Sequence, residues 1–352
     1  MATSETMQAW RLNDFNEDVQ KAIQNMEIEE VDVPVPEEGQ LLLKVSYSSV
    51  NPIDWKLFTG GYQEITPIDP FPYTPGFDVA GTVMSSALGF NIGDRVCTNT
   101  GLLESCKSPA PLPGGPAGAW GKFVVVPADT CVKIAHEKTK LKDVAGLPLA
   151  GVTALQGLFD TTMSGMNGET LGDAGPGKKV LILGASGGVG SLAVQLAKNK
   201  GDCFVCATAS DTPMSKGSEV TKIDLVESLG ADVVINYKKK EWSEELAGAD
   251  YDIIFDCVGN QEDLEKSAKV LKKGGRFISI ANFTGKAPNT DVRYTSFLIK
   301  AKKEHLQELV DMVEKGELLV PLDSQYEFTE VKDALKHSYS GRSTGKILIK
   351  VG

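Results

Sequence analysis

A glycine-rich turn between an aliphatic run and a helical pattern constrains this 352-residue chain more than any other feature. Residues 179–183 read Lys-Val-Leu-Ile-Leu, typical of a buried strand, and residues 191–198 have the apolar spacing of a helix. Between them, glycines at 184, 187, 188 and 190 allow a sharp turn and let a pyrophosphate approach main-chain N–H groups. This order predicts a dinucleotide-binding unit. The alternative is a glycine-rich turn that binds nothing.

The pattern of apolar residues changes near residue 150. After it, strands are expected at 180–183, 203–208, 233–236, 252–256 and 276–280, and helices at 188–200, 222–229 and 261–272. This alternation predicts a doubly wound parallel sheet. Before it, short apolar runs broken by proline and glycine predict a β-rich domain, which we expect the closing strand at 347–351 to rejoin. We predict an α/β protein with one domain of residues 1–150 and 301–352 and another of residues 151–300.

Composition restricts what the chain can bind and where it resides. A formal net charge of −11 argues against a nucleic-acid surface, which needs a basic face. No apolar stretch is long enough to span a membrane, and the polar residues 1–6 are unlike a targeting peptide. The six cysteines show no paired framework, and Cys203 and Cys206 fall in an expected strand, so we interpret them as reduced core thiols. We expect a cytoplasmic protein and leave association with an organelle surface open.

Seven segments carry a resemblance to a known family. They are residues 50–56 (VNPIDWK), 75–81 (PGFDVAG), 93–96 (GDRV), 147–154 (LPLAGVTA), the turn at 184–190, 229–232 (LGAD) and 341–346 (GRSTGK). In order and spacing they resemble the zinc-independent, ζ-crystallin-like quinone oxidoreductases of the medium-chain dehydrogenase/reductase family, and among these the enone reductases of plant chloroplast envelopes. The resemblance implies a GroES-like β-rich catalytic domain, a Rossmann nucleotide domain and a homodimer.

The positions of the zinc ligands separate the branches of this family. Zinc alcohol dehydrogenases have a cysteine where this chain has Asn51, and Gly-His-Glu where it has Gly76-Phe77-Asp78. Both differences remove ligands that a catalytic zinc ion would need. None of the three histidines lies at ligand spacing from a cysteine pair. We therefore expect no metal.

The end of the second Rossmann strand decides between NADH and NADPH. NAD-binding units place an acid about 20 residues after the turn, where it accepts the ribose 2′-OH. Counting from Gly190, that position is Ala209, and the small Ala209 and Ser210 leave room for a 2′-phosphate. The competing interpretation is that Asp211, two residues on, binds the ribose. We favour NADPH.

The resemblance implies further contacts to the cofactor. In family members that use NADPH, a lysine follows this strand, a tyrosine sits in an Ile-Asn-Tyr triplet and an arginine lies near the C-terminus. The matching residues here are Lys216 (or Lys222), Tyr237 and Arg342, although a solvated lysine and a strand-capping tyrosine are simpler explanations. The expected cofactor-binding residues are Thr153, Gly184, Ala185, Ser186, Gly187, Gly188, Val189, Gly190, Ser210, Lys216, Tyr237, Cys257, Val258, Ile280 and Arg342.

A reductase without a metal needs a substrate that is already electrophilic, such as a quinone or an α,β-unsaturated ketone or aldehyde. The resemblance puts Asn51, Asp54 and Lys56 at the nicotinamide pocket, where Asn51 is a candidate donor to the substrate oxygen. Lys56 is a candidate donor to the enolate or a partner of Asp54 in a structural ion pair, and Tyr62 is the candidate phenol for proton donation.

We expect NADPH-dependent reduction of a small quinone or enone. The alternatives are an enoyl-thioester reductase and a crystallin-like or scaffold protein that keeps its nucleotide site for stability.

Overall fold

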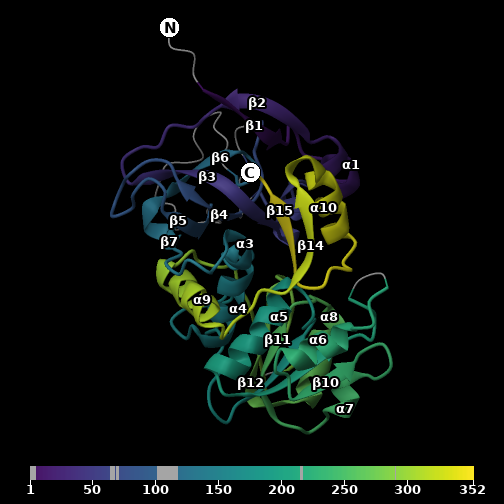
Figure 1. The fold of residues 1–352 in the computed structure, drawn as a ribbon. Coiled ribbons are helices and arrows are strands. Elements are labelled where there is room, and N and C mark those ends of the chain that lie inside the picture. Colours follow the sequence, from purple (N-terminus) through teal and green to yellow (C-terminus); the bar gives the residue numbers. More distant parts are fainter. Residues whose placement is uncertain (1–4, 64–67, 69–70, 101–117, 215–216, 290) are drawn as a thin grey trace. The chain divides into compact units, whose positions relative to one another are not determined.

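The computed structural model describes residues 5–352 except 64–67, 69–70, 101–117, 215–216 and 290. The chain forms two compact units (Figure 1). Unit 1 contains Met1–Leu149, Lys300–Gly316 and Ser324–Gly352, and unit 2 contains Ala150–Ile299 and Glu317–Asp323. None of the helices in the described part of the chain is long and apolar enough to cross a bilayer.

Unit 2 is built on a six-stranded sheet in which every pair of neighbours is parallel. Its strands are β8 (Lys179–Leu183), β9 (Phe204–Ala209), β10 (Val233–Asn236), β11 (Tyr251–Asp256), β12 (Leu271–Ser279) and β13 (Val292–Ser296). They lie in the order β10-β9-β8-β11-β12-β13, and the direction of winding changes between β8 and β11. This is the doubly wound Rossmann order, and it confirms the predicted fold class of this half of the chain.

In unit 2, helix α4 (Ala150–Phe159) precedes β8, and the helices that follow connect successive strands from β8 to β12 (Figure 1). They are α5 (Gly188–Gln195, extended by a π-helical turn over Leu196–Lys200), α6 (Lys222–Ser228), α7 (Trp242–Glu245) and α8 (Gln261–Lys266). The helix expected over 261–272 is too long, because α8 and a 3-10 turn end at Lys269 and β12 starts at Leu271. Leu271 pairs with Tyr251 of β11, so the last residues of the expected helix belong to the sheet.

Unit 1 contains a seven-stranded sheet built around the long strand β3 (Gln40–Val50), which pairs antiparallel with β4, β6 and β15. The other strands are β4 (Asp78–Val83), β5 (Arg95–Asn99), β6 (Phe123–Pro127), β7 (Val132–Lys133), β14 (Leu322–Glu327) and β15 (Lys346–Lys350). β1 (Thr6–Arg11) and β2 (Glu27–Asp32) form a separate pair. The C-terminal strand β15 therefore lies beside β3, about which the N-terminal half of the unit is built (Figure 1).

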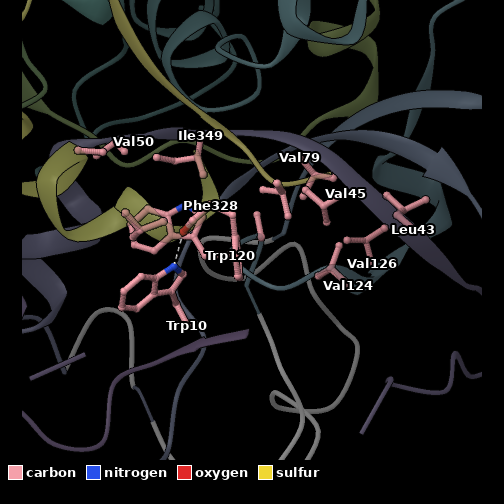
Figure 2. Close-up of a cluster of buried hydrophobic side chains, with 14 of the residues drawn as sticks. Trp10, Leu43, Val45, Val50, Val79, Trp120, Val124, Val126, Phe328 and Ile349 are labelled. Carbon is pink, nitrogen blue, oxygen red and sulfur yellow. Dashed lines mark hydrogen bonds between the residues drawn. The ribbon is translucent and has the colours of Figure 1, made fainter. Parts of the chain in front are cut away.

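The core of unit 1 packs aromatic and β-branched side chains from strands far apart in the sequence (Figure 2). The indole N–H of Trp10 donates to the carbonyl of Phe328 over 2.7 Å, and Trp120 is fully buried beside them. Gly76 has to lack a side chain, because a Cβ there would lie 2.7 Å from the Trp120 ring. Trp120 is thus a core residue of unit 1.

The helices of unit 1 are α1 (Val19–Gln24), α2 (Pro52–Leu57), α3 (Leu141–Val144), α9 (Lys303–Lys315) and α10 (Val331–Tyr339). The segment Glu317–Asp323 groups with unit 2, whereas the sequence interpretation gave all of 301–352 to the first domain. The physical reason lies in the Gln195 side chain, whose amide nitrogen donates to the carbonyl of Leu319 while its oxygen accepts the N–H of the same residue.

Candidate active site

The glycine turn joins β8 to α5 as the sequence predicts. Gly184 has φ of +74°, and Gly187 precedes the first turn of α5 with no side chain capping its N–H groups. A Cβ at Gly190 would lie 2.3 Å from the carbonyl oxygen of Gly184, so the helix can start this close to the strand only with glycine at 190. A Cβ at Gly187 would meet nothing nearer than 3.5 Å, which leaves its surroundings open to a ligand. Such a cradle fits a pyrophosphate.

Two neighbouring strands hold this turn in place. Thr208 of β9 accepts the N–H of Gly184 with its hydroxyl and the N–H of Ala185 with its carbonyl, each at 3.1 Å. At the end of β11, buried Asp256 accepts the N–H groups of Val258 and Gly259. Thr208 and Asp256 were not predicted from the sequence, although each lies at the carboxyl end of a parallel strand, where ligands of this fold bind.

Asp256 also organises the loop that contains Cys257, Val258 and Ile280. The Ser279 hydroxyl donates to its carboxylate over 2.7 Å, and the N–H of Ile280 donates to its carbonyl over 3.0 Å. The Val258 side chain is exposed and its Cγ2 lies 3.0 Å from where a Cβ of Gly184 would be. These three predicted residues thus lie at the same edge of the sheet as the glycine turn. Burial raises the pKa of the Cys257 thiol well above its usual range, so it is not a reactive thiolate.

A cluster of hydroxyl and ammonium groups follows β9. The Ser210 hydroxyl donates to Thr212 Oγ1 over 3.0 Å, and the Lys238 ammonium donates to the same oxygen over 2.9 Å. The backbone N–H of Lys222 donates to the carbonyl of Thr212 over 3.0 Å. Burial lowers the pKa of the Lys222 ammonium, the charge of Asp323 raises it, and the charge of Lys238 lowers it to a smaller extent. Two cations and two hydroxyls therefore gather where Ser210 was predicted to face a 2′-phosphate. Lys216 lies outside the described residues, and Lys238 was missed although it follows the predicted Tyr237 directly.

Asp211, the competing ribose ligand, is paired with a cation. Its carboxylate lies 2.5 Å from the Lys239 ammonium, and this hydrogen bond lowers the pKa of the Asp211 carboxyl.

The other predicted cofactor contacts differ in exposure. Tyr237 has 54% of its surface exposed and donates its backbone N–H to the carbonyl of Ala209, which leaves its ring accessible to a ligand. Thr153, an expected cofactor contact, is buried and is the fourth residue of α4, so it does not cap that helix. Arg342 lies exposed in the turn after α10 of unit 1.

In unit 1, Asn51 belongs to a buried polar network. Its amide nitrogen donates to Asp78 Oδ2 over 2.8 Å, and its amide oxygen accepts from the Lys346 ammonium over 2.6 Å. Lys346 is only 3% exposed and also lies 3.3 Å from the carbonyl of Val50 and 3.6 Å from Asp78 Oδ2. The Ser49 hydroxyl and the N–H of Leu149 donate to Asp78 as well. Lys346 is recognisable in the sequence as a lysine directly before the aliphatic run of the closing strand, but no local pattern pointed to these partners.

Asp54 lies at the edge of this network and does not pair with Lys56. Its Oδ2 accepts the backbone N–H of Asn51 over 2.7 Å at the start of α2, while its buried Oδ1 has no partner among the described residues. Burial, and to a lesser extent the charge of Asp78, raises the pKa of Asp54 well above its usual range. The structural ion pair considered between Asp54 and Lys56 is therefore wrong, because the carboxyl turns back to the helix N-terminus.

Lys56 and Tyr62 lie on one end of unit 1, near the end of α2. The Lys56 ammonium is 5.8 Å from the centroid of the Trp55 ring, and burial lowers its pKa. Tyr62 is half-buried against Leu57, Ile68 and Phe77. Trp55 meets Tyr339 edge-on at 5.1 Å between ring centroids, and both rings are partly exposed. This end of unit 1 thus combines a desolvated ammonium, a phenol and an aromatic surface.

The donor set at the zinc-ligand positions does not fit a zinc ion. Phe77 offers no donor atom and is buried in an apolar cluster. The oxygens of Asn51 and Asp78 face the Lys346 ammonium, which a divalent cation would have to displace. Across the residues that the structure describes, no group of three or more histidine, cysteine, aspartate and glutamate side chains could hold a metal.

Comparisons with known proteins agree with this architecture. The sequence profile of the "Alcohol dehydrogenase GroES-like domain" matches residues 37–136, and that of a "Zinc-binding dehydrogenase" matches residues 229–349. The chain is 33% identical to the chloroplastic quinone oxidoreductase of Triphysaria versicolor over 91% of its own length and 92% of that protein. It is 31% identical to the chloroplastic NADPH-dependent alkenal/one oxidoreductase of Arabidopsis thaliana, over 97% of its own length and 79% of that protein. The solved quinone oxidoreductase of Coxiella burnetii superposes with a TM-score of 0.81 at 27% identity, covering 99% of this chain and 100% of that one.

Proposed function

The chain belongs to the medium-chain dehydrogenase/reductase family, in its branch of quinone and enone oxidoreductases, and from this premise we propose that it uses NADPH to reduce a quinone or the C=C bond of an α,β-unsaturated carbonyl compound without a metal. That it is an oxidoreductase follows from the family, which sets aside the scaffold alternative. The cofactor, the substrate class and the absence of a metal are the parts proposed here.

The residues of unit 2 fit NADPH. The glycine turn at 184–190 and the N-terminus of α5 would hold the pyrophosphate, and the loop at 257–259 would border it. Lys238, with Thr212 and Ser210 beside it, would bind the 2′-phosphate. The position of Asp211 is suited to binding the ribose 2′-OH of NADH, but its carboxylate is already neutralised by the Lys239 ammonium, which weakens the case for NADH. Lys216, Tyr237, Thr153 and Arg342 stay predicted contacts.

The residues of unit 1 would act on the substrate oxygen. When bound, NADPH supplies a hydride, so the β-carbon of a conjugated carbonyl gains the hydride, the oxygen gains negative charge and the α-carbon later takes a proton. Asn51 would donate an amide N–H to that oxygen, and the desolvated Lys56 ammonium would stabilise the enolate. Tyr62 stays the predicted proton donor, and the buried carboxyl of Asp54 is a second candidate that the structure adds.

One observation carries the proposal that no metal is used. The oxygens of Asn51 and Asp78, at the positions that bind or flank zinc in the alcohol dehydrogenases, are occupied by the Lys346 ammonium. An ammonium donates hydrogen bonds but cannot take an alkoxide into its coordination shell as zinc does. A conjugated acceptor needs only hydrogen-bond donors, because it spreads its own charge into an enolate. This favours quinones and enones over simple alcohols.

Stopped-flow oxidation of NADPH against a panel of quinones, alkenals, alkenones and enoyl-CoA thioesters tests the proposal. We expect fast oxidation with quinones or short enones and none with saturated aldehydes. Efficient turnover of enoyl-CoA alone would instead support an enoyl-thioester reductase. NADPH binding without oxidation by any acceptor would contradict the proposed reaction.

Two broader expectations belong to the same proposal. The family resemblance implies a homodimer, and sedimentation as a monomer at micromolar concentration would reject it. Residence in the cytoplasm stays an expectation, and the relatives from Triphysaria versicolor and Arabidopsis thaliana are named chloroplastic. Imaging of a fluorescent C-terminal fusion distinguishes the two locations.

A further inference from the structure

Lys346 is a buried cation whose hydrogen-bonding capacity is used within one small network. It lies in β15, where its ammonium donates to the carbonyl of Val50 and the amide oxygen of Asn51 and forms an ion pair with the carboxylate of Asp78. Lysine is rarely buried this deeply unless such partners are present. The partners come from β3, the residue before α2 and the start of β4, so the ammonium lies where these elements meet.

The chemistry of its neighbours gives the Asn51 carboxamide a single orientation. An ammonium has no acceptor and an ionised carboxylate has no donor. The amide oxygen therefore has to face Lys346, and the amide nitrogen has to face Asp78. One N–H of the amide donates to Asp78, and among the described residues no acceptor is recorded for the second N–H. Without both Lys346 and Asp78 the carboxamide could rotate by half a turn and present its oxygen, an acceptor, in place of that donor.

A purely structural role accounts poorly for this arrangement. A buried ion pair adds little net stability, because the free energy of desolvating both charges offsets most of their attraction. An apolar pair of similar size would fill the same space between β15 and β4. The distinctive consequence of the ammonium is the fixed direction of the Asn51 amide.

We propose that Lys346 is a positioning residue for the reduction, which holds the free amide N–H of Asn51 toward the carbonyl oxygen of a quinone or enone. The inference rests on the proposed function, since it needs a substrate oxygen that gains negative charge. Asp78 is the second half of the device, because it receives the other amide N–H and balances the charge of Lys346. Lys346 does not contact the substrate, so it acts on the reaction only through Asn51.

The test removes the ion pair without leaving a charge unpaired. Lys346→Met alone would strand the buried Asp78 carboxylate and destabilise the fold, so the informative variant is Lys346→Met with Asp78→Asn. In a folded double variant, kcat for an enone should fall about tenfold or more, since a misplaced donor commonly costs this much, while the Kd for NADPH stays unchanged. Lys346→Arg should recover part of kcat by keeping the donor. Lys350→Met, at the exposed end of the same strand, is the matched control and should behave like the wild type.

A second background separates positioning from general damage. In Asn51→Ala, which has no carboxamide to orient, the same double substitution should lower kcat no further. Wild-type kcat in the folded Lys346→Met/Asp78→Asn variant, or an additive loss in the Asn51→Ala background, would overturn the inference. If the double variant does not fold, Lys346→Arg is compared in the wild-type and Asn51→Ala backgrounds. It should lower kcat in the wild-type background only, and an equal loss in both backgrounds would overturn the inference. If the wild-type protein fails to oxidise NADPH with every conjugated acceptor tested, the proposed function itself is overturned. This result is available before any variant is made.

Discussion

Replacing Lys238 by alanine should weaken NADPH binding selectively. The Lys238 ammonium donates to Thr212 Oγ1 over 2.9 Å, beside Ser210 and Lys222, so its position is fixed at the end of β9. A hydrogen bond between charged groups contributes about 1.5–3 kcal/mol, and the exposure of this lysine favours the lower end of that range. The Kd for NADPH should therefore rise about tenfold, while the Kd for NADH, which has no 2′-phosphate, should not change.

Fluorescence titration of each variant with both cofactors measures this effect. Lys240→Ala is the matched control, because Lys240 is an exposed lysine of the same run that pairs with Glu245. Lys239→Ala should act differently: it releases Asp211 from its ion pair, so NADPH binding weakens while NADH binding holds or improves. Equal losses for both cofactors in Lys238→Ala, or no loss for either, would refute the assignment of this cluster to the 2′-phosphate.

Three further predictions follow from the geometry. Gly190→Ala should destabilise the fold, since its Cβ would lie 2.3 Å from the Gly184 carbonyl and overpacking costs about 1–3 kcal/mol, whereas Gly187→Ala should keep the thermal midpoint and weaken only NADPH binding. The pKa of Asp54 is raised in the folded chain, so the unfolded chain loses this proton first as pH rises. The free energy of unfolding should therefore fall between the ordinary aspartate pKa and the folded one. In Asp54→Asn the thermal midpoint should depend less steeply on pH, and an unchanged dependence would contradict this. Prolonged treatment with chelator should leave activity intact, and stoichiometric zinc in active protein by elemental analysis would contradict the donor-set argument.

The sequence predicts the fold well where local chemistry dictates it. The strand, the glycine turn and the start of α5 occur where expected, because only glycine at 190 lets the helix start beside the strand. The parallel sheet also follows, since its strands are continuous apolar runs. The end of α8 was misplaced by several residues, because the short apolar run around Leu271 fits a helix or a strand equally well by periodicity.

The sites were less predictable because they depend on contacts between distant segments. Lys346 lies 295 positions from Asn51 in the sequence, and no local pattern relates them. Lys238 was missed for a different reason: it lies in a run of three lysines, and only the turn after β10 determines that this one reaches Thr212 while Lys239 reaches Asp211. The sequence supplied the residue types, and tertiary structure supplied the pairings.

The product formed from a short enone tests the central claim most directly. Reduction of pent-3-en-2-one with NADPH deuterated at the transferable position can be followed by NMR of the purified product. Metal-free conjugate reduction predicts saturated pentan-2-one with deuterium on the former β-carbon, and no oxidation of ethanol in the presence of NADP⁺. Formation of the allylic alcohol pent-3-en-2-ol, or turnover of ethanol, would contradict the account.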